Sequence, residues 1–205
     1  MTTEKAGVFK ETYENYLQEI SGLDLGRIAV ILGGEIRDNG LLISYFNREY
    51  TVSSTGVKGP QGTTPGFAIS VVLLKYILMA PEARPIPRGE WRSFKDFADA
   101  GPLVTYFAST ATQVVERAFD GKVDLLFARC RALGAKASTF SSSYDLSMEL
   151  PMLPNAPLVV NFNDRDEEFP SSCTLLYDRT VESCLDMESV AITGATLAGL
   201  LVKSD

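Results

Sequence analysis

Apolar positions along the chain have helical or strand periods, and the longest apolar run predicts the centre of the fold. Residues 67–80 read FAISVVLLKYILMA, and only Ser70 and Lys75 interrupt the apolar pattern. Such a segment predicts a helix contacted from several sides, ended by Pro81. A membrane-spanning helix needs about 20 apolar residues, so this run is too short to span a bilayer. We therefore expect a central core helix.

Helical spacing recurs near the amino terminus. In residues 8–20 one helical face carries the apolar positions Phe9, Tyr13, Tyr16, Leu17 and Ile20. Aromatic side chains at this spacing could stack on a ligand, but they are more often part of a core. Residues 25–32 form a continuous apolar run that fits either a short helix or a buried strand. The pair Gly33-Gly34 after it favours a helix.

Further helices are predicted in the second half of the chain. Residues 103–119 and 123–133 have apolar positions at helical spacing, and Gly121 separates the two segments. Residues 188–202 predict a last helix, in which Gly194 and Gly199 allow the close approach of a neighbour.

Strands are predicted as two hairpins and one alternating segment. Residues 41–46 and 49–53 read as a hairpin about Asn47-Arg48, and residues 158–163 and 173–177 read as a second hairpin. Alternation from Tyr144 to Leu150 adds another strand. The fold class is therefore α+β, with a mostly antiparallel sheet from residues 41–53 and 144–177 packed against five to seven helices. We expect residues 1–205 to form a single domain.

Composition limits the partners and the compartment. The 205 residues are 45% hydrophobic, and 19 Lys and Arg against 26 Asp and Glu give a net charge of −7. We expect no nucleic-acid partner and no membrane binding, because both depend on clustered cations. The amino terminus has no apolar signal core. Three cysteines without a CxxC pair (Cys130, Cys173 and Cys184) predict free thiols in the cytoplasm.

The chain contains no histidine. Histidine is the usual general base near neutral pH and the commonest metal ligand. Its absence excludes Ser-His-Asp and Cys-His catalysis within this chain and argues against a zinc enzyme. We assign no catalytic residue, metal ligand or cofactor.

Arginines surround the only tryptophan in a proline-rich segment. Arg88 and Arg92 flank Trp91, and together they could hold an anionic or flat ligand by bidentate hydrogen bonds and stacking. The alternative is a structural role, in which Trp91 is mostly buried under Phe94 and Phe97 and orders the segment.

The loop of the second hairpin is acidic. Its carboxylates are Asp164, Asp166, Glu167 and Glu168. They could bind a ligand, and calcium or magnesium would favour such oxygens, but the residue order of an EF-hand is missing. Paired carboxylates could also run acid–base chemistry. The alternative is a solvated turn that blocks edge aggregation. Phe169-Pro170 predicts that the loop folds back onto the body.

Four phrases together resemble a known family. They are the helix end KYILMA, then GEWRSFKDF, DEEFPSSCTLLYDRT and LDMESV. From about Phe67 onwards the chain resembles an uncharacterised prokaryotic domain of unknown function, found mainly in anaerobes, with some members joined to a small iron–sulfur cluster domain. This chain has no cysteine cluster of its own. The resemblance implies a cytoplasmic protein and supplies no catalytic residues.

Three functional hypotheses follow. The first is a non-catalytic accessory domain that binds a small-molecule ligand or a protein partner in anaerobic redox or cofactor metabolism. The second is a carboxylate-dependent enzyme acting on a small anionic substrate, with Asp166 or Glu167 as acid or base and Arg88 or Arg92 holding the substrate. It requires the two loops to converge on one pocket. The third is a homodimer through the last helix.

Overall fold

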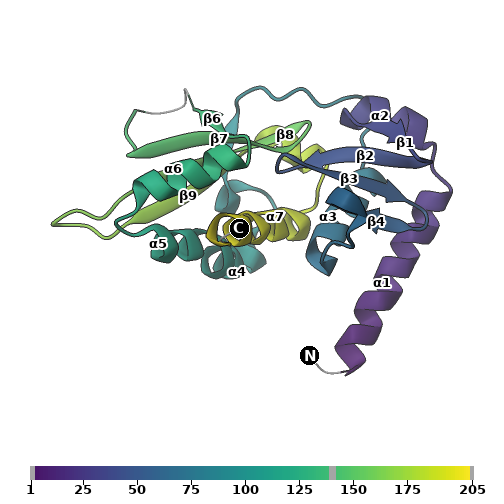
Figure 1. Ribbon diagram of the computed structural model, residues 1–205, viewed down its shortest axis with the longest axis horizontal. Helices are drawn as coiled ribbons and strands as arrows, with labels where there is room; N and C mark the ends of the chain where they lie inside the picture. The colour runs from purple at the N-terminus through teal and green to yellow at the C-terminus, as the bar shows by residue number, and fades with distance from the viewer. Residues whose placement is uncertain (1–2, 139–141, 204–205) are drawn as a thin grey trace.

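Two antiparallel sheets and a set of helices make up the fold (Figure 1). The computed structural model describes residues 3–138 and 142–203. The four-stranded sheet is β1 (Glu35–Arg37), β2 (Gly40–Tyr45), β3 (Arg48–Ser53) and β4 (Gly56–Lys58), in that order. The five-stranded sheet has the order β5 (Trp91–Ser93), β9 (Ser172–Asp178), β8 (Ala156–Asn163), β7 (Leu146–Leu153) and β6 (Lys136–Ala137). The α+β class is confirmed.

The two predicted strand regions belong to different sheets instead of one. They meet where the β2–β3 turn contacts the β7–β8 turn, and there the Phe46 N–H donates a 2.9 Å hydrogen bond to the Met152 carbonyl. The β2–β3 turn lies one residue earlier than predicted, at Phe46 (φ 48°) and Asn47 (φ 59°). Phenylalanine is uncommon in this left-handed region, but full burial of its ring favours this position.

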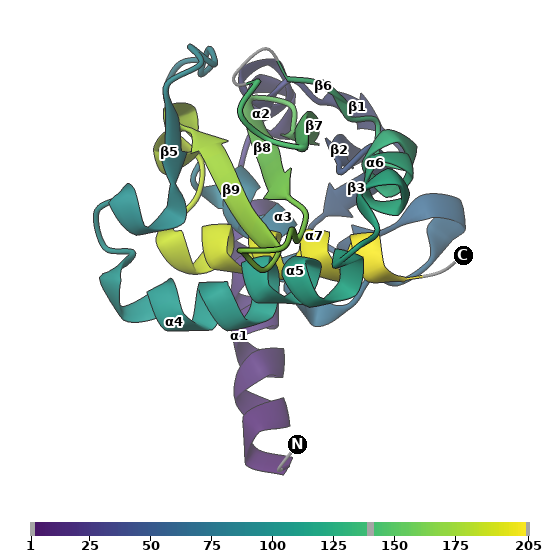
Figure 2. The ribbon, with the colours of Figure 1, turned by 90° about the vertical axis from the view of Figure 1, so that its left-hand side faces the viewer.

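The helices lie mainly below the sheets in the view of Figure 1. They are α1 (Thr3–Ser21), α2 (Leu25–Leu32), α3 (Phe67–Leu78), α4 (Val104–Phe107), α5 (Gln113–Phe119), α6 (Val123–Ala132) and α7 (Met187–Val202), with a π-helical turn at Ala108–Thr112 between α4 and α5. The amino-terminal half of α1 projects from the body (Figures 1 and 2). The side chain of Phe9 lies outside the described residues.

The central helix is confirmed as α3. Its side chains Val72, Leu73, Leu74, Tyr76 and Ile77 are buried, and it packs against α1 and α7. The helix ends at Leu78, before Pro81, as expected. No helix within the described ranges is long and apolar enough to cross a membrane.

Two glycines explain the end of α2 and the close packing of α7. Residues 25–32 are a helix, and Gly33 ends it in the left-handed conformation at φ 74°. In α7, a Cβ added at Gly194 would lie 2.5 Å from the ring of Phe107 and 3.1 Å from the Cβ of Ala111. The close approach that Gly194 allows is therefore to α4 and the π turn of the same chain.

Candidate functional site

The arginine and tryptophan group lies at the carboxyl end of β9. In β5, Trp91 is paired with Asp178 and Arg92 with Tyr177. Figure 2 shows β5 beside this end of β9. Arg88 is exposed, whereas Trp91 and Arg92 are half-buried. Most of Trp91 is therefore covered, as the structural alternative predicts, although part of its surface remains exposed.

A carboxylate orders the proline-rich segment before β5. Asp178 is fully buried, and its Oδ2 accepts hydrogen bonds from the backbone N–H groups of Arg88 (3.0 Å) and Gly89 (2.7 Å). Its Oδ1 accepts from the backbone N–H (2.9 Å) and the hydroxyl (2.8 Å) of Thr180. Buried carboxylates need such partners. Sequence reasoning did not assign Asp178 this role.

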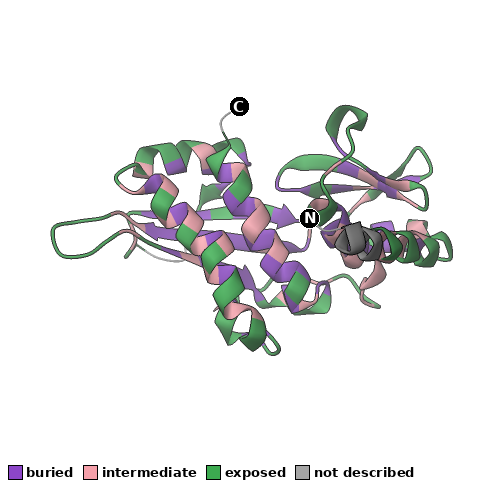
Figure 3. Cartoon of the chain, turned by 90° about the horizontal axis from the view of Figure 1, so that it is seen from below, coloured by how far each residue is buried: buried purple, intermediate pink, exposed green. Residues whose placement is uncertain are grey.

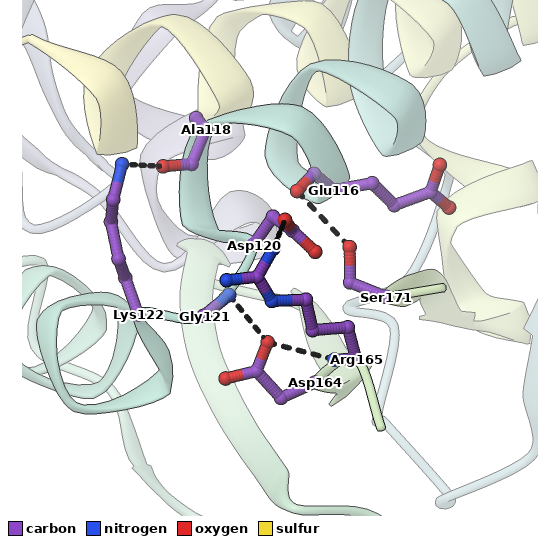
Figure 4. Close-up of polar contacts among 8 residues, drawn as sticks. All are labelled: Glu116, Ala118, Asp120, Gly121, Lys122, Asp164, Arg165 and Ser171. Atoms are coloured by element: carbon purple, nitrogen blue, oxygen red, sulfur yellow. Dashed lines mark hydrogen bonds and ion pairs between the residues drawn. The ribbon is translucent and has the colours of Figure 1, made fainter. Parts of the chain in front are cut away.

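The acidic loop uses its two aspartates as backbone acceptors. Asp164 accepts from the N–H of Gly121 at 2.6 Å, and the neighbouring Arg165 pairs with Asp120 at 3.1 Å (Figure 4). Asp166 accepts from the N–H groups of Phe169 (2.7 Å) and Glu168 (2.8 Å). These two hydrogen bonds, from Phe169 and then Glu168, lower the pKa of Asp166.

The rest of the loop faces solvent. Glu167 and Glu168 are exposed, and Phe169 is 65% exposed, so the expectation that Phe169-Pro170 folds the loop back onto the body is wrong. Figure 3 shows the loop extending from the sheet, and its residues 165–170 are exposed. The local hydrogen bonds of Asp166 stabilise the turn without such a contact. The loop contacts the body near its start, through Asp164 and Arg165.

The two predicted groups do not converge. The acidic loop precedes β9 and the arginine group lies at its other end, so the seven residues of β9 separate them by about 20 Å. The carboxylate-dependent enzyme hypothesis required a shared pocket. The structure therefore offers no common site for Asp166 and Arg88.

A cleft that sequence reasoning did not identify lies among α1, α3, α4 and α7. Its volume is about 850 Å³, and most of its lining is apolar. The lining residues are Thr12, Tyr16, Phe67, Ala68, Val71, Lys75, Leu103, Tyr106, Asp186, Glu188, Ser189, Ala191, Ile192, Ala195 and Thr196. A cleft of this size and composition is typical of small-molecule sites.

A partly buried ion pair lies in this cleft. The Lys75 ammonium is 3.2 Å from the Asp186 carboxylate and 5.2 Å from the centre of the Tyr16 ring. Asp186 also precedes the first turn of α7, where it accepts a 2.8 Å hydrogen bond from the Ser189 N–H. The pair thus links α3, α7 and α1.

Both groups of the pair are held in their charged forms. Burial disfavours the charge on Lys75, but the hydrogen bond and the charge of Asp186 outweigh it, so the pKa of Lys75 is raised. Burial likewise opposes ionisation of Asp186, but hydrogen bonds from Ser189 and Lys75 lower its pKa. Neither group is tuned to exchange protons near neutral pH.

Other reactive groups are inert or scattered. Burial raises the pKa of Cys130 to about 12 and also raises the pKa values of Cys173 and Cys184. A thiol protonated at neutral pH is a poor nucleophile. Within residues 3–138 and 142–203, no three His, Cys, Asp or Glu side chains are grouped to hold a metal.

Two sequence signals pointed towards the cleft. Lys75 interrupts an otherwise apolar helix, and Tyr16 belongs to the aromatic face of α1. Lys75 was interpreted only as an interruption of a core helix, and Tyr16 was interpreted as more often core than a ligand contact. Only the packing of α1 and α7 against α3 brings Tyr16 and Asp186 to Lys75.

Comparison with known proteins places the chain in a family. No curated protein and no solved structure gave a match. The matched family region, residues 24–199, contains α3, α4 and most of α7 of the cleft but not α1. The chain belongs to the family DUF3786, which is described as a domain of unknown function.

Proposed function

We propose that this protein is a non-catalytic accessory domain that binds a small molecule in the cleft among α1, α3, α4 and α7. The supporting observation is an apolar cleft of about 850 Å³ that contains one partly buried ion pair. Ligand sites combine apolar walls, which supply affinity, with a few polar groups, which fix orientation. Lys75 and Asp186 would orient the ligand, and Val71, Ile192 and Leu103 would contact its apolar part.

The electrostatics of the cleft support binding over catalysis. A general acid or base works best when its pKa lies near the working pH. The pKa of Lys75 is raised and that of Asp186 is lowered, so both remain charged through the neutral range. The chain also has no histidine.

We also propose a metabolic setting for the ligand. The chain resembles proteins of anaerobes, some of which are joined to iron–sulfur domains. This resemblance favours a cytoplasmic role in redox or cofactor metabolism. The ligand, or a protein partner, would come from that metabolism.

Self-association through α7 has less support. In α7 the small residues Ala191 and Gly194 are buried within the chain, whereas Ala195 is half-buried and Gly199 is exposed.

Recovery of a ligand with the purified protein tests this function. The protein is isolated without oxygen and examined by native mass spectrometry and by visible absorbance. Ala68 is exposed and lines the cleft, so Ala68→Trp should fill part of it. Ala128 is exposed on α6 and does not line the cleft, so Ala128→Trp is the matched control.

The proposal predicts a bound small molecule in the native protein and in Ala128→Trp, and its loss in Ala68→Trp. A molecule retained equally by all three proteins would place binding elsewhere. Protein that carries no molecule and binds none of the apolar probes described below would contradict the proposal.

A further inference from the structure

The charged groups of the cleft are unequal in number. Among the residues that the structure describes, three charged side chains line it: the cation Lys75 and the carboxylates Asp186 and Glu188. Lys75 and Asp186 pair with each other at 3.2 Å, and among the described lining residues Glu188 has no ion-pair partner. Glu188 lies in the first turn of α7, whose positive end offsets part of its charge. The whole chain carries a net charge of −7. The excess carboxylate among the described lining residues and the net charge of the chain both favour a cation over an anion.

The walls add aromatic surfaces suited to a cation. Phe67 and Tyr106 line the cleft and are 41% and 47% exposed, respectively. The Tyr16 ring already has the Lys75 ammonium at 5.2 Å from its centre, which shows that this wall accepts a positive charge. Aromatic faces attract organic cations through their electron-rich surface.

We infer that the ligand of the cleft is an apolar organic cation, such as an alkyl- or arylammonium compound. Its cationic group lies towards Glu188 and the aromatic rings of Phe67 and Tyr106, and its apolar part lies against Val71 and Ile192. This inference rests on the proposed function, because it names the ligand class of the same site. It differs from the anionic ligand or substrate expected for the segment of Arg88 and Arg92, which lies outside this cleft.

Three probes of the same length separate charge from apolar contact. Phenylbutylamine, phenylbutanol and phenylbutyrate are titrated into the full chain at pH 7, and affinities are measured by calorimetry. The amine should bind about three to ten times more tightly than the alcohol, and the carboxylate should bind most weakly. The preference for the amine should shrink as salt is added.

A matched pair of variants locates the charge. Glu188 is exposed, so Glu188→Gln should fold normally and should lower the affinity for the amine to about that for the alcohol. Glu167→Gln changes an exposed carboxylate outside the cleft and should leave the preference unchanged.

The outcomes distinguish the ligand class from the binding site itself. Equal affinities, tightest binding of the carboxylate, or an amine preference unchanged by Glu188→Gln would overturn the cationic ligand class and leave the cleft as a binding site. Failure of all three probes would overturn the cationic ligand class, and in a protein that also carries no molecule it would overturn the binding site.

Discussion

The ammonium of Lys75 lies 3.2 Å from the carboxylate of Asp186, and this contact joins the last turns of α3 to the start of α7. Both side chains are about one-third exposed, so solvent screens their attraction. Lys75→Met should therefore lower the free energy of unfolding by only about 0.5–1 kcal/mol at pH 7, as measured by urea denaturation.

The pH dependence of this contact has a definite sign. The folded pKa of Asp186 is below its usual value of 3.8, so its stabilisation is complete above that value and is lost as pH falls through the folded pKa. The folded pKa of Lys75 is above 10.5, so its stabilisation is complete below that value and is lost as pH rises through the folded pKa. The difference between the native protein and Lys75→Met should be constant from pH 5 to about pH 9 and should shrink below pH 4. A difference that peaks near neutral pH would contradict this assignment.

Asp178 should matter far more for stability. Asp178→Ala leaves the N–H groups of Arg88 and Gly89 without their buried acceptor, and it should cost about 2–4 kcal/mol. Limited proteolysis should then cut residues 84–90 more rapidly. Glu167→Ala, at an exposed position, should change stability by less than about 0.5 kcal/mol. Equal protease resistance of Asp178→Ala and the native protein would show that another contact orders the segment.

The two glycines of α7 form a matched pair. At Gly194 an added methyl group would lie 2.5 Å from the Phe107 ring, so Gly194→Ala should cost about 1–3 kcal/mol. At Gly199 nothing lies within 4 Å of the added carbon, so Gly199→Ala should be neutral or stabilising by up to about 1 kcal/mol. Thermal unfolding measures both. A Gly194→Ala protein as stable as Gly199→Ala would disprove the close packing of α7 on α4.

The cysteines should react slowly in the folded protein. Cys130, Cys173 and Cys184 are buried, and burial raises their pKa values. Iodoacetamide at pH 8 should label them slowly in buffer and completely in concentrated urea, as followed by intact mass. Rapid labelling of one cysteine in buffer would identify a reactive thiol that this structure does not contain.

Sequence patterns predicted the elements better than their assembly. The apolar run of α3, the glycine after α2 and the β8–β9 hairpin are local signals, because side-chain periodicity and turn chemistry act over a few residues. The division into two sheets is not local. It depends on how the Phe46 turn meets Met152, residues separated by about half of the chain.

The candidate site could not be predicted because its parts are distant in sequence. Tyr16, Lys75 and Asp186 come from three helices, and each alone is consistent with a packed or solvated side chain. The acidic loop attracted attention because its charges are consecutive, yet Asp166 uses its carboxylate for backbone hydrogen bonds. Similarly, Trp91 attracted attention as the only tryptophan, whereas Asp178 holds the segment beside it.

Trp91 remains a useful reporter of that segment. Because its side chain is half-buried in an edge strand, Trp91→Ala should cost about 1–3 kcal/mol, less than a fully buried tryptophan. Its emission should be partly quenched by iodide in the native protein and more strongly quenched in Asp178→Ala. Complete protection from iodide would contradict the observed exposure.

Ligand binding in the cleft is tested most directly by methyl nuclear magnetic resonance with phenylbutanol, a neutral probe that does not depend on the charge inference. Val71 and Ile192 line the cleft, whereas Val159 lies in β8 and does not. A binding site in this cleft predicts saturable shifts of the Val71 and Ile192 methyl signals, with no shift at Val159 and much smaller shifts in Ala68→Trp. Unchanged Val71 and Ile192 signals at saturating probe, or equal shifts in Ala68→Trp, would contradict a binding site in this cleft.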